Sequence, residues 1–263
     1  MDAEMPEEFY LPATNILPPD GPPGPQGGRP RVPNRTVLAV LWYVLVAGVR
    51  WKDVPRAFGC SGRTAHRRLP YGQKLGLFGS LHQLFLDALR RAGTLSADTV
   101  ILDSFHVRAH GGGELTGPNP TDRRKKGSKH TVLVDERGTP LVILTCGSHV
   151  SDHCQILPAV LAFPKIRGKP GAPKTRPRKL YADRGYDSAA ARAILRWLGI
   201  KAVIAQRNRE HGSGLGKVRW VVERTIRWLK GMRRMRLPYD RLAMMQLAWN
   251  TLAASVMCFR LLE

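Results

Sequence analysis

Three carboxylates far apart in this sequence stand in unusual surroundings. Asp103 follows an apolar run in TVILDSF, Asp183 ends KLYAD, and Glu223 lies among arginines in VRWVVERTIRWLK. Acids are scarce, since the chain has 20 Asp and Glu against 42 Lys and Arg. Carboxylate oxygens are preferred ligands of hard divalent cations, and such cations activate water or a hydroxyl group beside a phosphate. We therefore interpret the three acids as the catalytic and metal-binding residues of a metal-dependent nuclease.

Each acid also has an ordinary structural explanation. An aspartate at the end of a strand often caps a helix or forms a turn, so Asp103 and Asp183 alone decide little. Glu223 could simply form ion pairs with arginines one helical turn away. On a helical wheel, however, it is the one acid in a row of bases. That row is Arg219, Glu223, Arg227, Lys230 and Arg234, and the opposite, mostly apolar face is Val218, Val222, Thr225, Leu229 and Met232.

The overall charge indicates a polyanionic partner. The formal net charge is +22, and a chain this basic favours binding to nucleic acid. No apolar stretch reaches the length of a membrane span, so we expect no membrane partner and a cytoplasmic protein. The four cysteines form no C-x-x-C pair, which favours reduced residues over zinc ligands or disulfides.

The first third of the chain predicts an arm and a helical domain. Residues 1–33 are rich in proline and glycine, and we expect a flexible arm there. Residues 34–95 read as helices, with a turn at Gly59 and a helix capped by Ser61 that together resemble a helix-turn-helix. The second helix would present basic residues to a DNA groove or backbone. A generic helical bundle with a basic surface is the alternative.

From about residue 96 the periodicity changes to that of strands. TVILDSFHV, KHTVLVDE and TPLVILTCG predict three strands, the last two joined by a hairpin turn at Arg137 and Gly138. Helices and strands then alternate to the end of the chain. This order predicts an α/β fold, with a mixed sheet flanked by helices and preceded by the all-α domain.

At these motifs the chain resembles the DDE-type transposases of the insertion-sequence-five family. LDSFHVRAH is similar to the motif of the family's first aspartate, LYADRGYDS to that of the second, and VRWVVERTIRWLKGMRR to that of the glutamate. The segment DRRKKGSKHTVLVDERGTPL and the helical GVRWKDVPRAFG also resemble family segments. Several ordered motifs over most of a chain are far more specific than any one of them.

The resemblance implies a ribonuclease-H-like catalytic domain, here residues 96–263, with Asp103, Asp183 and Glu223 as the triad. It implies Mg²⁺ or Mn²⁺ as cofactor and double-stranded DNA, both element ends and target, as partner. We also expect a homodimer or higher oligomer on DNA, at the nucleoid. The residues expected to contact DNA are Arg63, His66, Arg67, Arg68, Lys129, Arg184, Arg219, Arg227, Lys230 and Arg234.

Two other functions remain open from the sequence. One is a different metal-dependent DNA nuclease on the same fold, which would cut DNA without joining strands. The other is a DNA-binding protein whose catalytic domain is inactive, which the intact triad argues against. Asp152 follows the third predicted strand and matches a family segment only in part, so we expect it to support the site rather than to bind metal.

Overall fold

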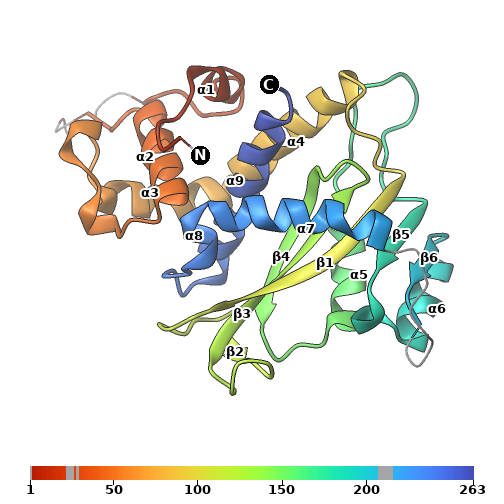
Figure 1. The fold of residues 1–263 in the computed structure, drawn as a ribbon. Helices are drawn as coiled ribbons and strands as arrows, with labels where there is room; N and C mark the ends of the chain where they lie inside the picture. The colour runs from red at the N-terminus through yellow and green to blue at the C-terminus, as the bar shows by residue number, and fades with distance from the viewer. Residues whose placement is uncertain (1, 22–26, 28–29, 207–215) are drawn as a thin grey trace.

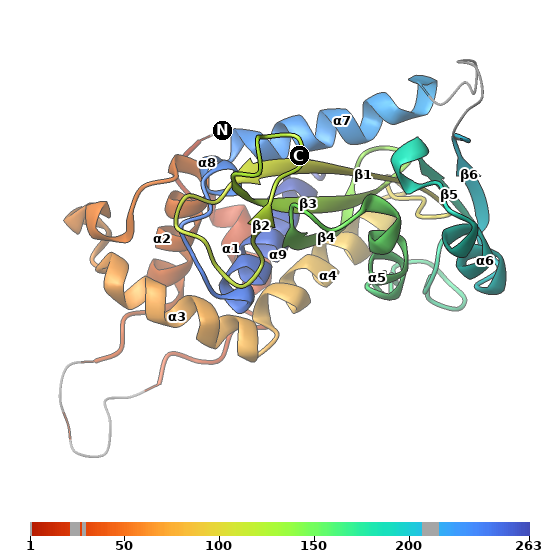
Figure 2. The same cartoon turned by 90° about the horizontal axis from the view of Figure 1, so that it is seen from below.

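The computed structural model describes residues 2–21, 27, 30–206 and 216–263. A sheet occupies its centre, with helices on both faces (Figures 1 and 2). Its strands are β1 (Thr99–Arg108), β2 (Gly117–Pro118), β3 (Lys126–Asp135), β4 (Pro140–Gly147), β5 (Lys179–Ala182) and β6 (Lys201–Ile204). No helix of the described part of the chain combines the length and apolar character needed to cross a membrane.

The pairing of these strands is mixed. β3 pairs antiparallel with β1 and β4, while β5 and β6 continue the sheet on the other side of β1 in parallel. Gly138, with φ of 91°, makes the β3–β4 turn where the sequence predicts it. The order β4-β3-β1-β5-β6, with helices on both faces, is the ribonuclease-H-like arrangement expected from the sequence.

Helices of the C-terminal half cover this sheet. They are α5 (Ile156–Leu161), α6 (Ala189–Trp197), α7 (Gly216–Gly231), α8 (Arg233–Arg236) and α9 (Ala243–Arg260), with the short 3₁₀ helices η3 (Asp152–Gln155) and η4 (Arg184–Tyr186). Helix α7 crosses one face, over β1 and β3, and α5 and α9 lie on the other (Figure 2). The expected apolar face of α7 is correct, because Val222, Thr225 and Leu229 are fully buried against the sheet.

The N-terminal half is helical, as predicted. It contains α1 (Glu7–Ala13), α2 (Asn34–Ala47), η1 (Trp51–Asp53), η2 (Arg56–Phe58), α3 (Gly62–Lys74) and α4 (Leu77–Arg91). Ser61 caps α3, since its hydroxyl accepts a hydrogen bond from the backbone N–H of Thr64 at 3.2 Å. Gly59 adopts a positive φ of 69° in the preceding turn.

Part of the segment expected to be a flexible arm is instead packed into the core. Phe9 of α1 is completely buried, and its ring contacts Trp42, Phe85 and Phe259 with centroids 4.8, 5.3 and 5.5 Å away. The proline and glycine content of residues 1–33 masked this apolar anchor. Because Phe259 belongs to α9, the N-terminal helices and the catalytic half share one hydrophobic core. The boundary expected between residues 95 and 96 therefore does not separate two cores.

Candidate active site

The sheet register brings the two predicted aspartates side by side. Leu102 of β1 pairs with Ala182 of β5 in the last step of their parallel ladder, so Asp103 and Asp183 follow on adjacent strands. The predicted strand TVILDSFHV is confirmed as β1, which continues past Asp103 to Arg108 because β3 stays paired with it. The carboxylate lies where the shorter neighbour β5 stops. Ligand sites commonly form at such carboxyl ends of parallel strands.

Helix α7 supplies the third acid. Its Arg219 reaches the sheet, where one guanidinium nitrogen, Nη2, lies 3.2 Å from Asp103 Oδ2 and 3.9 Å from Asp183 Oδ2. The same nitrogen lies 3.8 Å from Oε1 of Glu223, one turn further along α7. One oxygen of each acid thus borders a single cationic atom. The convergence expected from the sequence is present, because an oxygen of each acid lies within 3.9 Å of the same Arg219 nitrogen.

The electrostatics of the site follow from partial burial. Burial raises the pKa of Asp103, and the Ser104 backbone N–H and the charge of Arg219 oppose this rise only in part. Burial alone would lower the pKa of Arg219, yet the charges of Asp103, Asp183 and Glu223 together raise it. A cation between the acids therefore offsets the desolvation of the carboxylates. The three carboxylates are therefore suited to binding a cation of high charge density.

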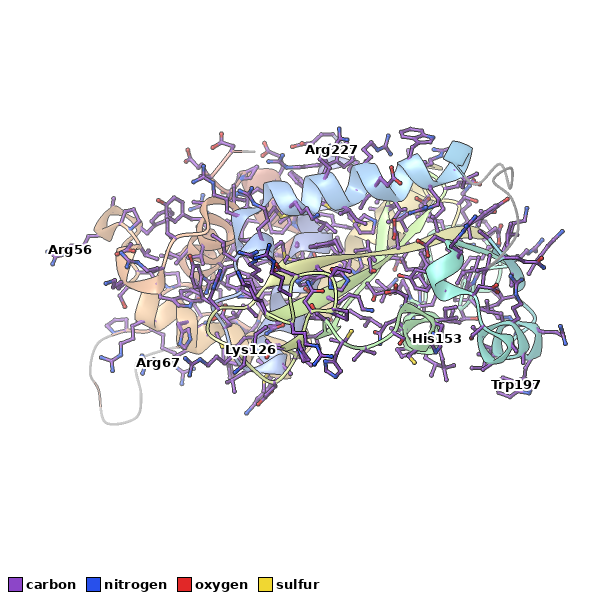
Figure 3. All side chains as sticks on the ribbon, turned by 60° about the horizontal axis from the view of Figure 1, so that its bottom comes forward. Arg56, Arg67, Lys126, His153, Trp197 and Arg227 are labelled. Carbon is purple, nitrogen blue, oxygen red and sulfur yellow. The ribbon has the colours of Figure 1, made fainter. Side chains whose placement is uncertain are left out.

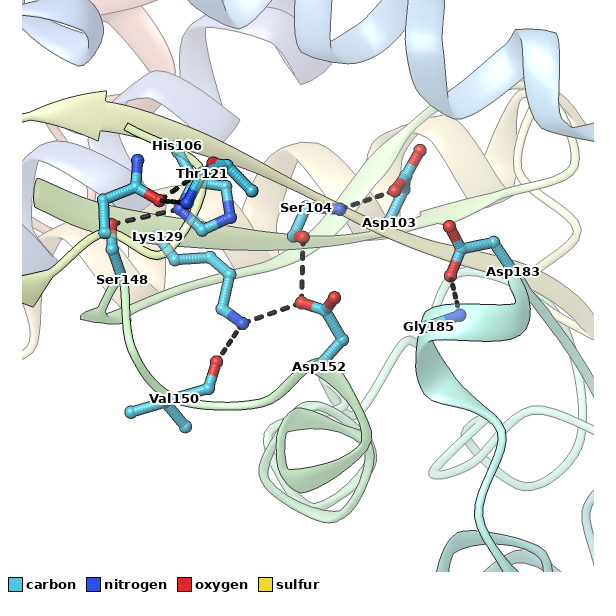
Figure 4. Close-up of polar contacts among 11 residues, drawn as sticks. Asp103, Ser104, His106, Thr121, Lys129, Ser148, Val150, Asp152, Asp183 and Gly185 are labelled. Atoms are coloured by element: carbon cyan, nitrogen blue, oxygen red, sulfur yellow. Dashed lines mark hydrogen bonds and ion pairs between the residues drawn. The ribbon is translucent and has the colours of Figure 1, made fainter. Parts of the chain in front are cut away.

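Asp183 is held in a fixed orientation by the turn that follows it. Its Oδ1 accepts a hydrogen bond from the backbone N–H of Gly185 at 2.8 Å, which caps η4 (Figure 4). Asp103 is fixed in the same way by its own neighbour, because the Ser104 N–H donates to Asp103 Oδ1 at 2.8 Å. Each aspartate thus keeps Oδ1 engaged and turns Oδ2 toward Arg219.

Two of the residues expected to bind DNA are buried and engaged elsewhere. Lys129 has a side chain only 2% exposed, and its ammonium donates to Asp152 at 2.7 Å and to the carbonyl of Val150. Arg234 is enclosed by aromatic rings and pairs with Asp240 at 2.7 Å. Arg234 falls on the periodic basic row of the predicted helix, and Lys129 lies in the segment that resembles the family. Neither signal distinguishes a solvated base from one that pairs with an acid in another element.

The other expected DNA contacts are at least partly accessible. Arg63, Arg67, Arg184 and Arg227 are exposed, and His66, Arg68, Arg219 and Lys230 are half-buried. Figure 3 labels Arg67 on α3 and Arg227 on α7, and both side chains lie at the surface of the molecule. Three of the half-buried residues have partners within the protein. Arg219 lies against the three acids, Arg68 donates to the Asn34 side chain, and the His66 ring packs against Trp51.

A cleft of about 590 Å³ adjoins helix α3. Its lining includes Arg31, Arg67, Arg68 and the aromatic Tyr71. Tyr71 is about half exposed, and among the residues that the structure describes no acidic side chain lines the cleft. The expected helix-turn-helix therefore presents a basic, partly aromatic groove to solvent.

Other candidate ligands do not assemble into a second site within the described residues. All four cysteines are free thiols there, as expected. In the same part of the chain, no three His, Cys, Asp or Glu side chains stand close enough to hold one metal ion as they are. Asp103, Asp183 and Glu223 do not meet that condition because they surround the guanidinium of Arg219.

Two family models match most of the chain. The model described as "Transposase DDE domain" matches residues 94–258, and the one described as "Putative transposase of IS4/5 family" matches residues 5–82. The first spans the sheet and all three acids. The second spans α1 to the beginning of α4, including the segment that packs Phe9 into the core.

Individual relatives agree with these matches. The "Putative transposase for insertion sequence element IS402" of Burkholderia cepacia is 51% identical over 148 residues, which is 56% of this chain and 70% of that protein. The "Insertion element IS402 uncharacterized 16.2 kDa protein" of the same organism is 37% identical over 116 residues, 43% of this chain and 79% of that protein.

Solved structures give a weaker likeness. The Mos1 transposase paired-end complex with left transposon end has a TM-score of 0.26 and 10% identity, over 80% of this chain and 78% of that chain. The Mos1 mariner paired end complex with Mn has a TM-score of 0.27 and 10% identity, over 95% and 85% of the two chains. The family relationship therefore rests on the sequence matches.

Proposed function

This chain belongs to the family of proteins with a transposase DDE domain, and on that premise we propose how its residues carry out DNA transposition. It binds the ends of an insertion element, cleaves DNA strands there and joins the freed 3′-hydroxyl to target DNA. The observation that carries this proposal is the meeting of Asp103, Asp183 and Glu223 around one cationic atom. Those three residues are the proposed catalytic and metal-binding acids.

The donor set fits divalent metal ions. It consists of carboxylate oxygens, and burial, which raises the pKa of Asp103, makes a nearby cation favourable for its charged form. We propose that Asp103, Asp183 and Glu223 hold Mg²⁺ or Mn²⁺. Such ions, when bound, lower the pKa of an attacking water or 3′-hydroxyl and stabilise the leaving 3′-oxygen.

The protein's own residues orient the reacting groups. The N–H groups of Ser104 and Gly185 hold Asp103 and Asp183 through Oδ1, so that Oδ2 of each faces the centre of the site. Arg219 balances the three negative charges. We propose that this guanidinium also binds the scissile phosphate, because an arginine fork matches phosphate oxygens.

DNA binding is assigned to two surfaces. On α3, Arg63 and Arg67 are exposed, and the half-buried Arg68 lines the adjoining cleft with Arg67 and Tyr71. Near the acids, Arg184, Arg227 and Lys230 are at least partly exposed. We propose that α3 reads the element end and that the second group holds the backbone at the cleavage site. An element has two ends, so a dimer or higher oligomer acting at the nucleoid fits this reaction.

The test of this function is Asp103→Asn in the full chain. The variant loses one carboxylate of the site, so we expect no detectable strand cleavage with Mg²⁺ or Mn²⁺. Binding to an end-containing DNA fragment is expected to stay within about twofold of wild type, because one negative charge near the phosphate is removed. Cleavage at the wild-type rate would show that the acids have been assigned wrongly.

A second candidate function is a metal-dependent nuclease that only cuts. A strand-transfer assay with pre-cut element ends separates the two, because a transposase gives joined products and a nuclease gives none. The matches to transposase families over both halves of the chain favour joining.

A further inference from the structure

A buried ion pair lies on the side of β1 opposite to the catalytic helix. Lys129 of β3 and Asp152 of η3 meet at 2.7 Å, and the lysine side chain is almost fully enclosed. A buried lysine requires a partner, because an unpaired charge in the interior is costly. Asp152 satisfies that need, yet its own carboxylate is 33% exposed and reaches toward the active site (Figure 4).

Asp152 is linked to Asp103 through a single residue. The hydroxyl of Ser104 donates to Asp152 Oδ1 at 3.2 Å, while the backbone N–H of Ser104 donates to Asp103 Oδ1 at 2.8 Å. Successive side chains of a strand point to opposite faces of the sheet. Asp103 therefore faces α7, and Ser104 faces the ion pair behind. A shift of Asp152 would pull on the same residue that orients Asp103.

Asp152 also approaches the turn that holds Asp183. A β-carbon added at Gly185 would stand 3.0 Å from Asp183 Oδ1 and 3.1 Å from Asp152 Oδ2. The two carboxylates thus border the same small space, which is left by the missing side chain of Gly185. The φ of this glycine lies outside the left-handed region, so close approach rather than backbone freedom explains the residue type here.

Tyr186 marks how closely these groups are packed. Its hydroxyl is buried among Asp152, Asp103 and Asp183 and lies near Ser104, but outside hydrogen-bond geometry. Burial raises the pKa of this tyrosine well above its usual value, so the hydroxyl stays neutral beside the acids. The Tyr186 side chain therefore occupies the space between the aspartates and restricts movement of their carboxylates.

We propose that Asp152, held in place by Lys129, is a positioning residue that sets the spacing of Asp103 and Asp183 from the opposite face of the sheet. It acts through the Ser104 hydroxyl on one side and through the turn at Gly185 on the other. This inference rests on the proposed function, because it assumes that the two aspartates hold metal. It assigns Lys129 to the support of the site in place of DNA contact.

The test uses variants that leave the ion pair intact. Ser104→Ala removes only the hydroxyl link to Asp152, and Gly185→Ala inserts a carbon between the two carboxylates. We expect each to weaken Mn²⁺ binding by about 10-fold or more, the range seen when partners of metal ligands are removed. Isothermal titration calorimetry of the full chain with Mn²⁺ alone measures this directly. A parallel thermal melt records whether the variants are folded.

A matched control comes from the same face of the sheet. Ser148 donates or accepts a hydroxyl hydrogen bond with His106 Nδ1 at 3.1 Å and has no hydrogen bond to any of the acids. Ser148→Ala therefore removes a comparable bond without touching the proposed links. We expect wild-type Mn²⁺ affinity in this variant. A tenfold loss in Ser148→Ala would overturn the proposal, because any loss on this face would then have the same effect.

Asp103→Asn separates the two levels of inference. If it abolishes Mn²⁺ binding while Ser104→Ala binds as wild type, the positioning role is wrong and the proposed function stands. If Asp103→Asn itself binds Mn²⁺ with wild-type affinity, the carboxylate site fails and the proposed function with it. Should Ser104→Ala not fold, Gly185→Ala alone decides, and wild-type affinity there would overturn the positioning role.

Discussion

At the scale of single residues, the site concentrates three negative charges around Arg219. The sequence predicts this arginine as a DNA contact, and the structure engages it with Asp103, Asp183 and Glu223. Gathering carboxylates at a partly buried place lowers the stability of the folded protein, because burial disfavours their charged form. The same arrangement suits a catalytic site. The loss of stability is clearest for Asp103, because burial raises the pKa of this acid.

Asp103→Asn is therefore expected to stabilise the protein at neutral pH. An acid whose pKa is raised on folding binds more protons in the folded state, so stability falls as pH rises from about 3.8 through the raised value. Asparagine cannot ionise, so the variant does not lose this stability as pH rises. We expect the variant to melt higher than wild type at pH 7. Calorimetric melts across pH measure the difference, which should vanish near pH 3.

Asp122→Asn provides the control of opposite sign. The Arg108 side chain, which donates to Asp122 at 2.6 Å, lowers the pKa of this half-buried acid. Stability from such a group is present above its unfolded pKa and is lost as pH falls. Asp122→Asn should thus melt no higher than wild type at pH 7. Equal stabilisation by both asparagine variants would contradict the explanation from burial.

At the scale of elements, the exposed face of α3 carries the proposed reading of DNA. Arg67 is exposed on this helix and lines its cleft. We expect Arg67→Ala to weaken binding to element-end DNA. A contact to a base edge would cost about 1–3 kcal/mol and reduce discrimination against random DNA, whereas a phosphate contact would weaken both equally. Fluorescence anisotropy with both DNAs distinguishes these outcomes.

The matched control is Arg196→Ala on α6. This arginine is also exposed, and its removal changes the net charge by the same amount. Binding should then differ from wild type by less than about twofold, as expected for a distant charge screened by salt. If Arg196→Ala weakens binding as much as Arg67→Ala, overall charge rather than α3 governs affinity.

The elements differ in how far the sequence could predict them. Strands β1, β3 and β4 and the apolar face of α7 follow from periodicity, because burial of one face requires it. The contact between Arg219 and Asp103 joins residues from α7 and β1 and depends on how α7 crosses the sheet. No pattern within either segment encodes that crossing. Arg234 was misassigned for the same reason, since its partners Asp240, Trp51 and Trp249 lie outside the predicted helix.

At the scale of the whole molecule, one core joins the N-terminal helices to the catalytic half. Phe9 is the clearest member, because its ring meets α2, α4 and α9. We expect Phe9→Ala to cost about 3–5 kcal/mol, as for other buried phenylalanines. The melting temperature should fall by at least about 6 °C. Leu11→Ala, on the same helix but 57% exposed, should change it little. A small effect of Phe9→Ala would show that α1 is not anchored.

The basic surface sets the salt dependence of DNA binding. Apart from Arg219, whose charge is already offset by the three acids, the bases proposed to face DNA are Arg63, Arg67, Arg68, Arg184, Arg227 and Lys230. With about 0.9 of slope per phosphate contact, log K against log salt should fall with a slope near −5. Arg67→Ala should make the slope shallower by about 1 if it contacts phosphate. Titrations from about 50 to 200 mM salt measure it, and a nearly flat line would contradict a phosphate-dominated interface.

The contact between Phe9 and Phe259 has a consequence for how the protein is made. Phe9 emerges from the ribosome long before its partner Phe259 on α9, because about 250 residues separate the two. At about 5–20 residues per second, the N-terminal helices wait many seconds before their core can close. The helix proposed to read DNA thus reaches its final packing only after the acids proposed to cut DNA have been synthesised. An interrupted chain would leave apolar surface exposed, a target for chaperones and proteases rather than a DNA-binding fragment.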